Sequence, residues 1–92
     1  MGLIEVLKFR AQLGPDGAKF FDTVDRLSRM MDFLSEAADK EKAIAQLIDD
    51  AQVQYKIIHS HKKEWKELTG DDPDKALADL YKLELSLEDE LQ

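Results

Sequence analysis

The chain has 92 residues, no cysteine and a net charge of −7, and 43% of its residues are hydrophobic. This composition fits one domain with a modest core, and it excludes a disordered chain, a disulfide scaffold and a cysteine-ligated zinc or iron–sulfur site. Because an acidic domain repels phosphate backbones, we expect no nucleic acid and a protein partner of basic or mixed charge.

Residues 2–13 are predicted to form a short N-terminal helix that ends at the breaker Gly14-Pro15-Asp16-Gly17. Either Pro15 occupies the first turn of the next helix or Asp16 caps it. This second helix is expected over residues 16–38, because apolar residues recur there with gaps of four and three. These positions are Phe20, Val24, Leu27, Met31, Leu34 and Ala38.

The apolar stripe loses phase near Asp39, which we interpret as a helix break with Asp39 as a possible cap. One uninterrupted helix through this gap is the alternative. A third helix is predicted over residues 41–69, and Gly70 supplies its C-terminal stop. Asp72 then caps a last helix over residues 73–90, with a proline at its first position.

The predicted fold class is therefore all-α: one domain, residues 1–92, forming a small antiparallel bundle of three main helices plus a short N-terminal helix. Residues 7–13 and 81–87 also alternate strictly, so a pair of strands is the alternative there. Two strands alone are marginally stable, which favours helices. The residues predicted to be largely buried are Leu27, Met31, Ile48, Tyr55, Ile58, Trp65 and Leu80.

No catalytic, cofactor or metal site is predicted. His59 and His61 point in nearly opposite directions on a helix, so they cannot hold one ion together. Glu64 and Glu67 match one carboxylate pair of a magnesium site, but the last helix lacks the second pair at the required spacing. The turn at residues 14–19 lacks the spacing of a phosphate loop.

A basic patch lies within the third predicted helix. We expect it to pair with the acidic last helix, because complementary charge helps to set which helices dock. A binding site for an anionic ligand is the alternative. The patch consists of Lys56, His59, His61, Lys62, Lys63 and Lys66.

Four apolar residues lie outside the predicted stripes: Met30, Phe33, Val53 and Ile57. Surplus apolar surface on a small protein often marks a protein interface, so these four are the predicted protein-contact residues. A thicker core that absorbs them is the alternative.

The predicted function is that of a small acidic binding module, such as an adaptor, an inhibitor or an immunity-type protein, that acts by surface contact and is not an enzyme. A self-assembling structural subunit, for example a homodimer, is the first alternative, and a small helical magnesium-dependent enzyme is the second. No apolar run approaches the roughly 18 residues of a membrane span, and no basic region precedes the apolar start, so we expect a cytoplasmic protein without a membrane partner.

Overall fold

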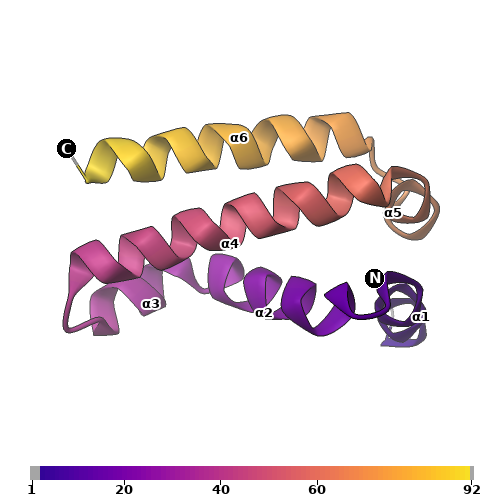
Figure 1. The fold of residues 1–92 in the computed structure, drawn as a ribbon, viewed down its shortest axis with the longest axis horizontal. Coiled ribbons are helices and arrows are strands. Elements are labelled where there is room, and N and C mark those ends of the chain that lie inside the picture. Colours follow the sequence, from indigo (N-terminus) through magenta and orange to yellow (C-terminus); the bar gives the residue numbers. More distant parts are fainter. Residues whose placement is uncertain (1–2, 92) are drawn as a thin grey trace.

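The computed structural model describes residues 3–91, and the fold is all-α (Figure 1). The described residues contain no strand, so the alternative of paired strands at residues 7–13 and 81–87 is wrong. The elements are α1 (Leu3–Leu13), α2 (Asp16–Ser28), α3 (Met30–Glu36), α4 (Lys40–Ser60), α5 (Lys62–Thr69) and α6 (Pro73–Glu90).

Helix α4 is the central element of the fold. The α2–α3 segment packs along one side of α4 and α6 packs along another, while α1 and α5 meet at one end of the molecule (Figure 1). Within the described chain, the backbone of α6 runs close to α4 and α5 but not to α2 or α3. A helix flanked on two sides must present a wide apolar arc, so residues outside a single apolar stripe of α4 can be buried.

Local capping chemistry sets two helix starts as predicted. The Asp39 carboxylate accepts a hydrogen bond from the Lys42 backbone N–H at 3.1 Å, so the break near Asp39 is confirmed. The Asp72 carboxylate accepts one from the Asp74 N–H at 3.0 Å, with Pro73 opening α6. Both caps occupy orphan N–H groups that a helix cannot pair internally.

The two longest predicted helices are each interrupted at one further residue. Arg29 separates α2 from α3 with φ −111°, and His61 separates α4 from α5 with φ −129°. The His61 N–H is shared between the carbonyls of Ile57 and Ile58, at 3.0 and 3.1 Å. Neither break contains proline or glycine, so the sequence carries no local signal for it.

The main core cluster lies where α1, α2, α4 and α6 meet. Its buried members are Leu13, Phe20, Ile57, Ile58 and Leu77, and the half-buried Phe21, Val24, Val53, Trp65 and Leu80 pack against them. The Phe20 and Trp65 rings meet edge to face with centroids 6.5 Å apart. Burial of Ile58 is thereby confirmed, and Trp65 and Leu80 border the core.

Two residues predicted to be buried are exposed: Met31 keeps 75% of its surface accessible and Tyr55 keeps 36%. The break at Arg29 shifts the phase of the stripe, which turns Met31 outward. Tyr55 lies on the flank of α4 that faces α6, away from the centre of its buried arc. The other two predicted core residues, Leu27 and Ile48, are half-buried.

Candidate protein-contact surfaces

The four predicted contact residues lie at two separate places. Phe33 is half-buried and lines a shallow depression of about 130 Å³ on α2 and α3, and Met30 is half-buried on the same helix. Val53 and Ile57 line a different groove, of about 320 Å³, between the start of α2 and α4. The two hollows share no lining residue, so the four residues do not form one surface.

The expectation that Ile57 lies outside the core is wrong, because its side chain is only 5% exposed. Val53 also packs against the core cluster. Both residues line the groove between the start of α2 and α4, so the buried arc of α4 extends further toward α2 than the prediction assumed. For these two residues the alternative of a thicker core is confirmed.

A buried ion pair joins α2 to α4 beside the Phe33 depression. The Arg26 guanidinium donates to both carboxylate oxygens of Asp50, at 2.7 and 2.8 Å, and Gln46 donates to the same carboxylate at 3.0 Å. Asp50 is 1% exposed, and its hydrogen bonds raise the pKa of Arg26 further above its ordinary value. Acidic residues on a helix are ordinarily exposed, so the sequence analysis did not identify this pair. The one signal for it in the sequence is the position of Asp50 among the apolar residues of α4.

The net charge of the molecule is concentrated at one end. We call residues 30–49 and 84–91 the acidic end: α3, the first half of α4 and the last turns of α6, which lie together at the left of Figure 1. This end carries nine acidic and two basic side chains, whereas the rest of the chain carries eleven of each. The entire charge of −7 therefore belongs to the acidic end.

The acidic side chains in the last turns of α3 and α6 oppose the dipoles of those helices, whereas Asp32 and Glu41 lie in first turns, where acidic side chains are favourable. Neither α3 nor α6 has a basic residue in its last turn, and Glu88, Asp89 and Glu90 close α6. The C-terminal turn of a helix is its negative end, where acidic side chains are unfavourable. Stability alone therefore does not explain this arrangement.

The acidic end also exposes apolar surface. Met31 is 75% exposed, Leu85 and Leu91 are each 43% exposed, and α3 has no buried residue. Large apolar side chains surrounded by one sign of charge are typical of a recognition surface rather than of a core.

A second surface lies in the groove between α4 and α6. Two adjoining hollows of about 350 and 280 Å³ share Tyr55 and Tyr81, and the His59 ring stacks on Tyr55 with centroids 6.3 Å apart. Lys62 pairs with Asp74 at 3.0 Å across this groove. For Lys62, the predicted pairing of the basic patch with the last helix is confirmed.

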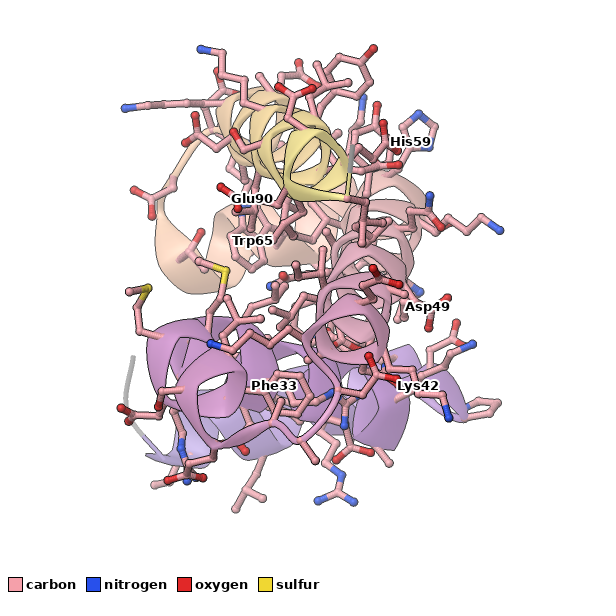
Figure 2. The ribbon with its side chains drawn as sticks, turned by 90° about the vertical axis from the view of Figure 1, so that its left-hand side faces the viewer. Phe33, Lys42, Asp49, His59, Trp65 and Glu90 are labelled. Atoms are coloured by element: carbon pink, nitrogen blue, oxygen red, sulfur yellow. The ribbon has the colours of Figure 1, made fainter. Side chains whose placement is uncertain are left out.

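A third surface lies on the opposite side of the molecule. Figure 2 shows Trp65 and Glu90 on the side of α4 away from Asp49 and His59. We call this the open side: it runs along α4 between α3 and α6, whose backbones do not run close to each other. On the same side of the molecule, Trp65 lines a hollow of about 250 Å³ between α5 and the start of α6, together with Asp71, Asp72, Lys75, Ala76 and Asp79.

No group of three or more potential metal-binding side chains occurs in the part of the chain that the structure describes. Among the described residues, no helix is long and apolar enough to cross a membrane. Comparison of the chain with protein-family models, characterised proteins and solved structures found no match.

Proposed function

We propose that this chain is a helical binding module that captures a cationic segment of a partner protein by surface contact. The observation that supports it most is the location of the whole net charge of −7 at one end of the fold. A cleft or patch lined by one sign of charge attracts the opposite charge over a distance and accelerates association.

Two further features support the same function. The acidic side chains at the end of α6 disfavour the free helix, and a cationic partner would relieve that repulsion. Exposed Met31 lies within the acidic end, and methionine adapts its shape to many apolar partners. An adaptor or an inhibitor that masks a basic surface needs both properties.

The test compares two variants that change the net charge equally. One removes three exposed carboxylates of the acidic end, and the other removes three exposed carboxylates elsewhere. The acidic-end variant is Glu36→Gln, Asp89→Asn, Glu90→Gln, and the control is Asp16→Asn, Asp22→Asn, Glu67→Gln.

Binding of a synthetic lysine- and leucine-containing peptide is measured by titration calorimetry at low and at physiological salt. We expect the acidic-end variant to bind about tenfold more weakly and the control to change by less than about twofold, because charge acts within a Debye length of about 10 Å. Equal losses in both variants would reduce the effect to net charge and contradict a defined site.

Self-assembly is the second candidate, and one observation on α1 favours it. Ile4 and Leu7 are 70% and 54% exposed, and residues three apart share one helix face. Sedimentation at several concentrations tests it: an Ile4→Lys, Leu7→Lys variant should be more monomeric than the parent chain. If the parent is monomeric throughout, this candidate fails and the binding module is unaffected.

A further inference from the structure

We propose that the cationic partner segment binds as an amphipathic helix on the open side, with Met31, Leu83 and Trp65 as its apolar contacts. This inference rests on the proposed function and adds the place and the conformation of the bound segment. The bound helix would occupy the space between α3 and α6 and would lie alongside α4, α3 and α6 as the fourth helix of a bundle. We call this position the seat.

The α3 wall of this seat is formed by Met31 and its neighbour Leu34. Phe33 lines the depression beside Arg26. Met31 precedes Phe33 by two residues, about 200° on the helical wheel, so it lies on nearly the opposite side of α3, away from that depression. Its 75% exposure leaves it available to a ligand, and the half-buried Leu34 lies next to it.

The α6 wall combines apolar and acidic side chains. Glu90 lies on the open side in Figure 2. Leu83 and Asp79 precede Glu90 by seven and eleven residues, close to two and three helical turns, so they share its side of α6. Asp79, Leu83 and Glu90 therefore form one row along α6. Leu83 is half-buried, and Asp79 also borders the Trp65 hollow.

The floor of the seat at its far end is the Trp65 hollow. Three aspartates and one lysine line it besides Trp65 and Ala76. An aromatic base with a carboxylate rim fits a long cationic side chain, because its stem packs on the ring while its charged end reaches the carboxylates. Acidic side chains therefore lie at both ends of the open side, Glu90 at one end and the three aspartates of this hollow at the other.

Backbone chemistry favours a helical ligand over an extended one. The described residues contain no strand, so no sheet edge can pair with an extended segment. A polyproline segment docks on exposed aromatic rings, but Phe33 is the one aromatic residue of the acidic end and it is half-buried on the other side. A helix satisfies its own N–H and C=O groups and presents apolar anchors at one-turn spacing.

The open side is as long as α6, which has 18 residues. At 1.5 Å per residue this corresponds to about 27 Å, the length of an 18-residue ligand helix. The probe is therefore an 18-residue amphipathic peptide of leucine and lysine without tryptophan. Its control has the same composition in an order that lacks an apolar face.

The 92-residue chain is titrated with each peptide while Trp65 emission and the helix content by circular dichroism are recorded. We expect the amphipathic peptide to gain helicity, to shift Trp65 emission and to bind at least about tenfold more tightly than its control, since apolar anchors supply most interface affinity. Equal binding of both peptides would overturn the helical seat and leave the proposed function standing. Binding of neither would overturn both.

Two matched substitutions locate the seat. Met31→Asp changes an exposed residue on the open side, and Tyr81→Asp changes an exposed residue on the other side of α6, in the groove between α4 and α6. We expect Met31→Asp to weaken binding of the amphipathic peptide at least about tenfold and Tyr81→Asp to change it by less than about twofold. The reverse result would move the docking site to the groove between α4 and α6 and refute the open-side seat.

Discussion

The two ends of this molecule differ in core packing and in charge. The end at which α1 and α5 meet contains the main core cluster around Phe20 and Ile58, and its charges balance. The acidic end holds the whole net charge, and its helix α3 buries no residue completely. Ala43, Leu47 and Leu87 are buried at the acidic end as well, so both ends contribute to the core. The main core cluster stabilises a fold whose acidic end carries charges that repel one another.

The largest expected effect tests this division with one aromatic residue at each end. Phe20 is 2% exposed and its ring contacts both Phe21 and Trp65. Phe20→Ala should lower the free energy of unfolding by about 3–5 kcal/mol, because it opens a cavity in a packed core.

Phe33→Ala is the matched change at the acidic end, where the ring is half-buried against a shallow depression. It should cost clearly less, about 1 kcal/mol, the typical cost of a point substitution. Urea denaturation followed by circular dichroism measures both. Equal costs would show that the acidic end shares the core, and the comparison would fail.

The second prediction concerns the ion pair that joins α2 to α4 between the two ends. Arg26→Leu leaves the Asp50 carboxylate, which is 1% exposed, with the hydrogen bond donated by the Gln46 side-chain amide. Arg26 itself is 35% exposed, so the cost should fall at the low end of such losses, about 3 kcal/mol.

The double variant Arg26→Leu, Asp50→Leu should recover most of that loss, because it removes the stranded charge as well. Thermal melts of the two single variants and the double variant form the cycle. Additive losses would mean that the pair contributes through independent contacts instead of through its charges.

The sequence predicted the features that depend on near neighbours. Asp39 and Asp72 were identified as caps because a cap needs only an acceptor beside a few orphan N–H groups. The all-α class followed from the spacing of apolar residues. These signals act within one helical turn, so the remainder of the fold does not alter them.

The sequence was less informative wherever three-dimensional packing decided the outcome. A single apolar stripe was assumed for α4, but this helix has neighbours on two sides, so Ile57 is buried toward α2 while Tyr55 is exposed beside α6. The break at Arg29 lacks proline and glycine, and it reversed the expectation for Met31. The gathering of charge at one end depends on the antiparallel path of α6, which no linear charge count reveals.

The third prediction compares the two confirmed caps, one at each end. Asp72→Ala at the start of α6 should cost about 0.5–2 kcal/mol. Asp39→Ala removes an equivalent cap but also one negative charge from the acidic end, so it should cost a few tenths of a kcal/mol less. Chemical denaturation in low salt resolves the two. A larger cost for Asp39→Ala would indicate that repulsion at the acidic end is negligible.

The smallest expected effect has opposite signs at the two ends. Asp89→Lys places a cation in the last turn of α6, among like-charged neighbours, and should raise the free energy of unfolding by about 0.3–1 kcal/mol. Asp22→Lys makes the same change of charge in the middle of α2, four residues before Arg26, and should lower it by about 0.2–0.5 kcal/mol.

Salt separates charge from packing in this last pair. At about 1 M salt the Debye length falls to about 3 Å, so both changes should shrink toward zero if they arise from charge. Melting curves at low and high salt measure this directly. A gain for Asp89→Lys that survives high salt would have to come from packing, and the repulsion attributed to the acidic end would then have no effect on stability. A gain that disappears would mean that the free protein keeps a destabilising charge at this end, which is the property that a cationic partner would relieve.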